Sequence, residues 1–462
     1  MLEIIISILF LIAVGYFVAK NYDAKIVLFL VAFLLLFISV FLGHTIETTT
    51  PTGSIWLDPF AKATDVFKMQ MGIVGLTIMM LFGFAAYMNH IGANDAMVAV
   101  LSKPIQKIRS VYILVPVVFL LGNALQMVLP SAAGLAILLM ATLYPALRTA
   151  GMSPLTAGAV IATTATITPT PLGSDNVVVA QHLGISSLDY VLKYHAKVSI
   201  PALIIMAVAH LFWQRHLDRR AGTVHVPYQP EHSEAEKLAK LKPAPLWYAI
   251  FPIVPILLLL LFNLAFINPE TGKPLLKMGL PEITLISILI PLLIELIRKR
   301  SFQKSIKDFN LFFEGMGQGF FQVVSLIIAA GLFVESLKAI GIITTLTNSL
   351  NDVEGAGPIL MFFFSGMAAL IGFLSGSGIA VFHSFIKIIP EITTQMDVNT
   401  VMVALPMQLT ANLIRSASPV AAVIIIVASV LKVNPLVIVK RTSVPVFVGI
   451  FTCLALSYYF YG

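Results

Sequence analysis

Two ionisable residues, Asp175 and Arg415, occupy stretches of this 462-residue chain that are otherwise apolar. Charged side chains within membrane-spanning segments are rare and usually functional. The planar guanidinium of Arg415 can hold a carboxylate through two parallel hydrogen bonds, so a carboxylate ligand is one interpretation. The other interpretation is that Asp175 and Arg415 only neutralise each other as a buried ion pair.

The sequence around each of these residues interrupts an apolar segment with proline and small polar residues. The two interruptions are ATITPTPLGSDNVVVA (165–180) and TANLIRSASPVAAV (410–423). Two similar breaks, PSAAG (130–134) and SGSG (375–378), separate the arms of two expected hairpins. Non-helical backbone is tolerated at membrane depth only where protein buries it or where it lines a wet cavity. We therefore expect all four breaks to meet near the middle of the membrane.

A helix is expected to begin after each break, near Ser131, Ser174, Ser375 and Ser418. The unpaired N–H groups of helix N-termini attract anions, carboxylates included. Glycines at the breaks would let a ligand approach the backbone closely. This pattern predicts a site for a small molecule with two carboxylates.

The elements that must position these residues are apolar helices. The chain is 58% hydrophobic and 11% charged, with a mean hydropathy of +0.95, which excludes an ordinary soluble domain. At about 20 residues per crossing, the apolar runs supply roughly ten crossings. The expected spans and hairpins are 2–19, 25–43, 73–93, 110–150, 154–184, 197–214, 247–266, 281–297, 317–340, 357–393, 399–433 and 442–461. The single cysteine, Cys453, excludes an intramolecular disulfide.

Basic residues orient this path across the membrane. With both termini outside and the polar segment 215–246 in the cytoplasm, twenty of the 29 Lys and Arg residues lie inside, eight lie outside and Arg415 lies in mid-membrane. This is the bias that the positive-inside rule requires. Cytoplasmic loops then explain the net charge of +7, and no nucleic-acid partner is expected.

An internal repeat supports the two hairpins. LPSAAGLAILLMATLYP (129–145) resembles LSGSGIAVFHSFIKIIP (374–390), with Ser131 matching Ser375 at a separation of 244 residues. KVSIP (197–201) resembles RTSVP (441–445) at the same separation. On the expected path the two units are inverted, which is typical of secondary transporters because the halves can exchange roles. The expected divisions are an N-terminal helix, a first repeat, a cytoplasmic loop with a linking helix, and a second repeat, at 1–24, 25–217, 218–279 and 280–462.

Each repeat also has a stretch of charged and apolar residues before its core, at 54–70 and 301–316. The apolar spacing predicts helices that lie in the interface plane, and an ordinary loop is the alternative, above all for the proline-containing stretch 54–70. As interfacial helices, the two stretches would join a moving part to a fixed one.

Several segments of the sequence resemble a known family. GFAAYMNHIGAND (83–95), LLMATLYP (138–145), SGSG (375–378), ANLIRSASPV (411–420) and IVKRTSVPV (438–446) are similar to the anaerobic C4-dicarboxylate carriers of the DcuC family. That family is similar to a wider superfamily of divalent-anion carriers, in which hairpins and broken helices form the substrate site. The resemblance implies an all-α polytopic fold of two inverted repeats, each with a re-entrant hairpin and a broken helix.

The resemblance also implies how such a protein works. Its transport domain would move as an elevator against a dimeric scaffold in a bacterial inner membrane, surrounded by lipid and with both termini periplasmic. The implied substrates are succinate, fumarate and malate. Carried over by position, the substrate-binding residues would be Ser131, Ala132, Ala133, Gly134, Ser174, Asp175, Asn176, Ser375, Gly376, Ser377, Gly378, Asn412, Arg415, Ser416 and Ser418.

One departure from the wider superfamily concerns the coupling ion. Its sodium-coupled branch carries Ser-Asn-Thr at the hairpin tips, whereas these tips read Ser-Ala-Ala and Ser-Gly-Ser. We therefore expect coupling to protons, or exchange with a counter-substrate, rather than sodium. Exchangers of basic or zwitterionic amino acids have a related architecture and form the alternative function.

Other classes of function fit the sequence less well. The chain has no HExxH, no GxSxG and no cysteine-based metal cluster, so we expect no enzyme activity, cofactor or metal. A channel could use Asp175 and Arg415, but paired hairpins favour a carrier. Three amides, Asn123, Gln126 and Gln408, are expected to hydrogen-bond between helices rather than to contact a ligand.

Overall fold

The computed structural model describes residues 2–20, 22–103, 108, 110–129, 131–222, 244–266, 276, 278–341 and 355–462. Within these ranges the regular structure is helical and contains no strand. Nine helices in the described part are long and apolar enough to cross a membrane, or up to ten if a helix pair bent by 74° counts as one span. The expectation of an all-α, multi-pass membrane protein is therefore confirmed.

The helices follow the order expected from the sequence. In the first part of the chain they are α1 (Leu2–Ala19), α2 (Ala24–Phe41), α3 (Asp58–Gln70), α4 (Leu76–His90), α5 (Ala93–Ser102), α6 (Val111–Gln126), α7 (Ala132–Thr149), α8 (Pro154–Ala162), α9 (Ser174–His182), α10 (Ser187–Tyr190) and α11 (Ala196–Ala221). In the second part they are α13 (Val254–Leu260), α14 (Leu280–Lys299), α15 (Phe302–Gly319), α16 (Ser325–Ala339), α18 (Ala356–Ser375), α19 (Gly378–Phe385), α20 (Ile388–Gln395), α21 (Thr400–Ile414), α22 (Ala422–Leu431) and α23 (Pro435–Tyr461).

Both predicted broken helices are interrupted in the structure. The first stops after α8 and resumes as α9, with residues 163–173 between them. The second stops after α21 and a short 3-10 turn, Arg415–Ala417, and resumes as α22. The two predicted hairpins correspond to α6 with α7 and to α18 with α19. The inversion of the two units and the division of the chain into four parts stay predictions.

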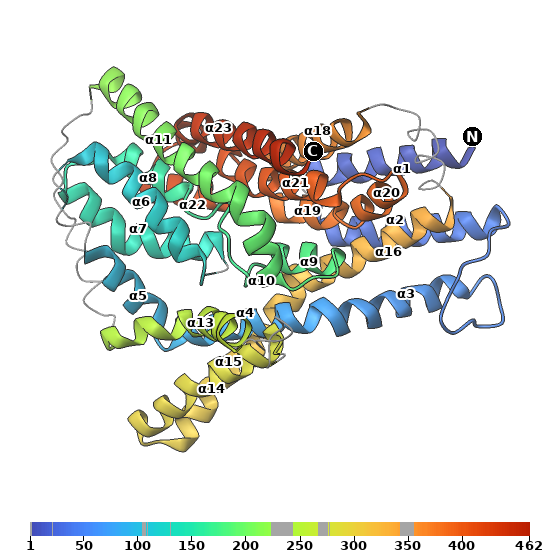
Figure 1. The fold of residues 1–462 in the computed structure, drawn as a ribbon, viewed down its shortest axis with the longest axis horizontal. Helices are drawn as coiled ribbons and strands as arrows, with labels where there is room; N and C mark the ends of the chain where they lie inside the picture. Colours follow the sequence, from blue (N-terminus) through green and yellow to red (C-terminus); the bar gives the residue numbers. More distant parts are fainter. Residues whose placement is uncertain are drawn as a thin grey trace.

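Two long arms cross beside these elements (Figure 1). The expected amphipathic stretches 54–70 and 301–316 correspond to α3 and α15. Neither is a separate helix, because each runs without a break into the helix that follows it. Each continues through a single π-helical turn, Met71–Gly75 or Phe320–Val324, into α4 or α16. The two π-turns contact each other, and a Cβ on Gly75 would lie 3.0 Å from Cγ1 of Val324.

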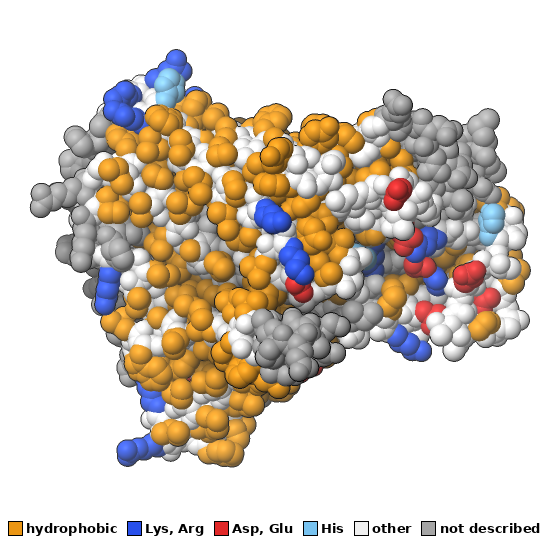
Figure 2. Space-filling view, viewed as in Figure 1, with side chains coloured by type: hydrophobic (Ala, Val, Ile, Leu, Met, Phe, Trp, Pro, Cys, Tyr) orange, Lys and Arg blue, Asp and Glu red, His pale blue; other side chains and the backbone are white. Residues whose placement is uncertain are grey.

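The interrupted helices lie between these arms and a layer formed by α11 and α23 (Figure 1). Helix α23 packs on α11 and on α21, while α21 packs on α18. Helix α4 packs along α15, and α16 packs along α2. Figure 2 shows hydrophobic side chains over much of the left part of one face, as expected for a surface that contacts lipid, with charged side chains at the left edge and also in the middle and right of the view.

A buried ion pair fastens the ends of three helices. The Arg441 guanidinium of α23 lies 2.6 Å from the Asp218 carboxylate of α11, and both side chains are at most 5% exposed. The hydroxyls of Ser153 and Thr156 donate to the same carboxylate at 2.9 and 2.8 Å, which brings the start of α8 into the cluster. Buried charges are stable only when they are paired and hydrogen-bonded in this way.

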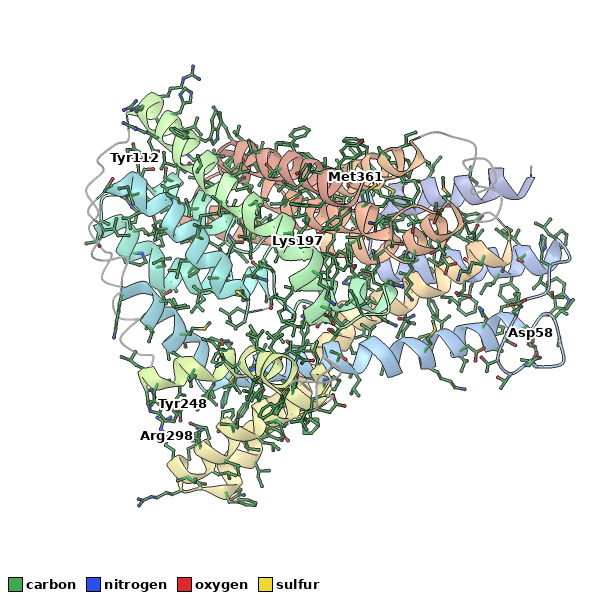
Figure 3. The ribbon with its side chains drawn as sticks, in the orientation of Figure 1. Asp58, Tyr112, Lys197, Tyr248, Arg298 and Met361 are labelled. Carbon is green, nitrogen blue, oxygen red and sulfur yellow. The ribbon has the colours of Figure 1, made fainter. Side chains whose placement is uncertain are left out.

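A second polar cluster closes the corner between α14 and the 3-10 helix Leu246–Ile253. Tyr248 and Arg298 lie close together there (Figure 3), with Arg298 donating to the Tyr248 hydroxyl at 2.9 Å. The buried carboxylate of Glu295 accepts from both Arg298 and Lys299, at 3.1 and 2.6 Å. These bonds hold the linking segment against the end of α14.

Candidate functional site

The N-terminal turns of four helices line one central cavity of about 390 Å³. They belong to α7, α9, α19 and α22, which start at the four breaks in the chain. The lining residues from these turns are Ser131, Ala132, Ala133, Gly173, Ser174, Asp175, Ser377, Gly378, Ile379, Ala380, Ala421, Ala422 and Val423. The predicted convergence of four helix N-termini is confirmed, although two of the helices begin later than expected.

The corrections concern α19 and α22. Helix α18 continues through Ser375 and ends at Gly376, whose φ of +71° is the left-handed conformation that glycine adopts readily. The hydroxyl of Ser377, not Ser375, then caps α19 by accepting from the Ala380 N–H. Beyond Ser418 the backbone makes one more turn, and α22 starts only at Ala422.

Ten of the fifteen predicted site residues line the cavity, namely Ser131, Ala132, Ala133, Ser174, Asp175, Gly376, Ser377, Gly378, Asn412 and Arg415. The other five are Gly134, Asn176, Ser375, Ser416 and Ser418. Ser375 lines a neighbouring cavity of about 280 Å³, which shares Ser377 and Ala380 with the central one.

The remaining four residues hold the breaks in shape. The Gly134 N–H donates to the capping hydroxyl of Ser131 at 3.1 Å. The Asn176 amide donates to the Thr170 carbonyl at 2.7 Å. The hydroxyls of Ser416 and Ser418 donate to main-chain carbonyls at the ends of α8 and α18, at 2.9 and 2.5 Å. Their role in the structure is therefore to satisfy backbone groups that the breaks leave without helical partners.

Asp175 and Arg415 face the same cavity but do not pair with each other. Oδ2 of Asp175 accepts from the Gln408 amide at 2.8 Å and from the Asn412 amide at 2.6 Å. Arg415 donates through Nη2 to the carbonyl of Ala165, and its buried Nε has no hydrogen-bond partner among the described residues. The geometry does not support the interpretation as a mutual ion pair.

This arrangement is suited to an anion. Arg415 supplies a fixed positive charge, and the four helix N-termini add partial positive charge and unpaired N–H groups around the same space. Asp175 is the one acidic side chain among the lining residues. An anionic ligand would therefore meet the cation at one place and a carboxylate at another.

Comparison with known proteins agrees with this geometry. The sequence model described as "DcuC: C4-dicarboxylate anaerobic carrier" matches residues 2–460. The chain belongs to the DcuC family. It is 36% identical over 451 residues to "Anaerobic C4-dicarboxylate transporter DcuC" of Escherichia coli (strain K12), covering 97% of this chain and 95% of the relative. It is 35% identical to a protein of Vibrio cholerae named "Probable anaerobic C4-dicarboxylate transporter DcuC", covering 98% and 97% of the two chains.

Two solved structures share the fold at low sequence identity. MtrF of Neisseria gonorrhoeae has a TM-score of 0.60 and 15% identity, with 97% of each chain covered. YdaH of Alcanivorax borkumensis has a TM-score of 0.55 and 14% identity, with 92% of this chain and 96% of that one covered. Both are membrane transporters. The DcuC family and its named relatives are also transporters, so the expectation that the chain is not an enzyme is confirmed.

In this DcuC-family chain, several polar residues that line the cavity were not predicted from the sequence. They are Gln126 of α6, Gln322 of the second π-turn, and Thr166, Thr168 and Thr170 of the first break. The prediction that Gln126 hydrogen-bonds between helices is wrong. Gln126 lines the cavity, and its Oε1 is buried without a hydrogen-bond partner among the described residues. The sequence did carry a signal for these threonines, because TATITPT places several hydroxyls within one interruption of an apolar segment.

The other two amides do bond between helices, as predicted. Asn123 of α6 accepts from the Thr166 hydroxyl at 3.0 Å and donates to the Thr163 carbonyl at 3.3 Å, which pins the first break. Gln408 of α21 bonds across to Asp175 and Asn176 of α9. Residues from the first and second halves of this DcuC-family chain thus meet behind the cavity.

Proposed function

We propose that this chain is a secondary active transporter that carries C4-dicarboxylates such as succinate, fumarate and malate across a bacterial inner membrane. The observation that carries the proposal is the position of Arg415, which lines a cavity at which four helix N-termini meet and whose buried Nε has no hydrogen-bond partner in the described part of the chain. The names of the E. coli and V. cholerae relatives support the same substrate class. They do not favour the alternative, an exchanger of amino acids.

The two carboxylates of the substrate would bind at different places. Arg415, beside the start of α22, is placed to hold one of them through its planar fork. The N–H groups at the starts of α7 and α9 lie elsewhere on the cavity wall and are suited to the second. A monocarboxylate would satisfy only one of these positions, which gives the site its preference for dicarboxylates.

The transport cycle would use the two halves of the chain. We infer that the halves are inverted, that the hairpins and broken helices move as an elevator, and that the arms α3–α4 and α15–α16 belong to the fixed scaffold of a homodimer. Supporting this division, both arms have the same construction of helix, π-turn and 15-residue helix. Coupling would be to protons or to a counter-substrate.

A radiolabelled uptake panel with purified protein in proteoliposomes tests the proposal. We expect saturable flux of succinate, fumarate and malate, inhibition of each flux by the other two substrates, and little flux of arginine. Exchange of arginine without dicarboxylate flux would refute the proposal and establish the amino-acid alternative.

A further inference from the structure

The carboxylate of Asp175 is held by the protein through one oxygen only. Its Oδ2 accepts two hydrogen bonds, at 2.8 Å from Gln408 and at 2.6 Å from Asn412. Its Oδ1 accepts none from the described residues. Asp175 lines the central cavity, and Oδ1 lies beside Gly173, another lining residue. One acceptor atom of a carboxylate is therefore left for whatever enters the cavity.

The Gln408 amide, one of the two donors to Oδ2, is fixed in orientation by its other partners. The Tyr190 hydroxyl bonds to Oε1 of Gln408 at 2.6 Å, so the NH₂ group of that amide must point the other way. This NH₂ group donates both to Asp175 and to Oδ1 of Asn176, the latter at 2.6 Å. Tyr190, Gln408 and Asn176 are all buried. A proton arriving at Asp175 would consequently bind to Oδ1.

The sum of the charges in the occupied cavity favours the binding of a proton at Asp175. Arg415 contributes one positive charge and Asp175 one negative charge, so a dicarboxylate dianion would leave two negative charges in excess. Two carboxylates that face each other in a site of low dielectric cannot both stay ionised without a large repulsion. One proton shared between Asp175 and the nearer substrate carboxylate removes that repulsion and forms a hydrogen bond.

The other titratable groups near Asp175 are less well placed to carry this proton. They are Tyr190 of α10, His195 of the π-turn before α11, His383 of α19, and Arg415. His195 is buried and bonded to the Ser199 hydroxyl at 3.0 Å. His383 is buried, and both of its ring nitrogens lack partners among the described residues. Of these groups, only Asp175 and Arg415 line the cavity.

We propose that Asp175 is the proton-coupling residue, and that each dicarboxylate is carried with one proton held between Oδ1 of Asp175 and the substrate carboxylate that Arg415 does not bind. The inference rests on the proposed function and specifies its coupling. The proton enters from the solution on the loading side and leaves with the substrate on the other side. No bond other than the O–H bond forms or breaks.

Asp175→Asn tests the proposal because asparagine imitates the protonated acid. Its carbonyl oxygen would accept from Gln408 and Asn412 in place of Oδ2, and its NH₂ group would face the substrate in place of the proton. In proteoliposomes with a trapped pH dye, we expect succinate uptake by the wild type to acidify the interior. In Asp175→Asn, succinate exchange should persist with an apparent affinity lowered by up to about tenfold, and the acidification should disappear.

Asp189→Asn is the matched control. Asp189 lies nearby in sequence, but its carboxylate is exposed and pairs with Lys193 at 2.7 Å outside the cavity. This variant should acidify the interior as the wild type does. Acidification by Asp175→Asn at the wild-type ratio of protons to succinate would overturn the proposal. A folded Asp175→Asn protein that has lost both succinate exchange and acidification would also overturn the proposal, because the negative charge of Asp175 would then be needed for binding.

A measurement on the wild type covers the case in which Asp175→Asn does not fold. Succinate is added to detergent-purified protein in weak buffer, at a pH where free succinate is a dianion. We expect the solution to lose one proton for each succinate bound, and binding without proton uptake would overturn the proposal. Absence of any dicarboxylate binding would instead refute the proposed function.

Discussion

The backbone of Gly378 lies directly against the carbonyl oxygen of Ala411, so closely that a Cβ on Gly378 would be 1.6 Å from that oxygen. The tip of the second hairpin is thereby seated on α21 next to Asn412, a residue that bonds to Asp175. The position of the hairpin tip and the geometry of the cavity depend on the same contact.

Gly378→Ala should therefore displace the tip and impair both stability and transport. Because the obstructing atom is backbone, we expect a cost of about 1–3 kcal/mol or more, as for other overpacked sites. Thermal unfolding in detergent and succinate exchange measure the two effects. Gly366→Ala on the exposed face of α18 is the control, since a Cβ there meets nothing within 4 Å. An equal effect of the two substitutions would contradict the prediction.

Arg415→Lys should fold but lose most of its affinity for dicarboxylates. A lysine ammonium can still donate to the Ala165 carbonyl, but it cannot form two parallel bonds to a carboxylate. Loss of one charge-assisted hydrogen bond corresponds to a KM raised about tenfold or more. The KM of succinate exchange is the measurement, and Asp175→Asn should not restore it. Substantial transport by the double variant Asp175→Asn, Arg415→Gln would show that the two residues serve only each other.

Arg441→Met should destabilise the protein by about 3–5 kcal/mol, because it removes the guanidinium from the buried Asp218 carboxylate. Adding Asp218→Asn should recover part of the loss, since the uncompensated charge is then gone. Thermal unfolding gives both values. Lys193→Met, which removes an exposed ion pair with Asp189, should change nothing measurable. A double variant less stable than Arg441→Met alone would argue against the buried pair as the cause.

The two hairpins should be accessible from opposite sides of the membrane. Ser110 and Ala356 are described residues at the starts of α6 and α18, whereas Lys107 and Asp352, which lie at the predicted bases, fall outside the described residues. In a Cys453→Ser background, Ser110→Cys should label with an impermeant reagent from the cytoplasmic side and Ala356→Cys from the periplasmic side. Labelling of both from one side would refute the inversion of the two units.

Transport should not require sodium. The hairpin tips offer few side-chain oxygens, and a hard cation needs several oxygen ligands. Replacing sodium with choline at constant pH should leave most succinate flux intact in proteoliposomes. Complete loss of flux would show that main-chain carbonyls at the breaks supply the ligands instead.

The sequence was sufficient to predict the interrupted helices and ten of the residues that line the cavity. Proline and small polar residues within apolar runs are local signals, so the breaks around Asp175 and Arg415 could be located without a structure. The cap of α19 could not be located in the same way, because Ser375 and Ser377 are equally suited to capping. Only the left-handed conformation of Gly376 shows that the second serine takes that role.

Contacts between residues that are far apart in the sequence could not be predicted from local sequence patterns. Gln408 reaches Asp175 across 233 positions in the chain, and no spacing rule connects them. The continuity of α3 with α4 was also missed, because the charged residues of 54–70 indicated a helix at the interface. In the structure the same helix axis carries both the charged and the apolar segments through a π-turn.

The paired π-turns have a mechanical consequence. A π-turn replaces the regular i→i+4 bonds of a helix with wider ones, so the rod is least stiff there. In this molecule the most compliant segments of both arms touch each other at Gly75 and Val324. Gln322, on one of these turns, also lines the cavity. The two arms therefore meet at their least stiff segments, and one of these segments forms part of the cavity wall.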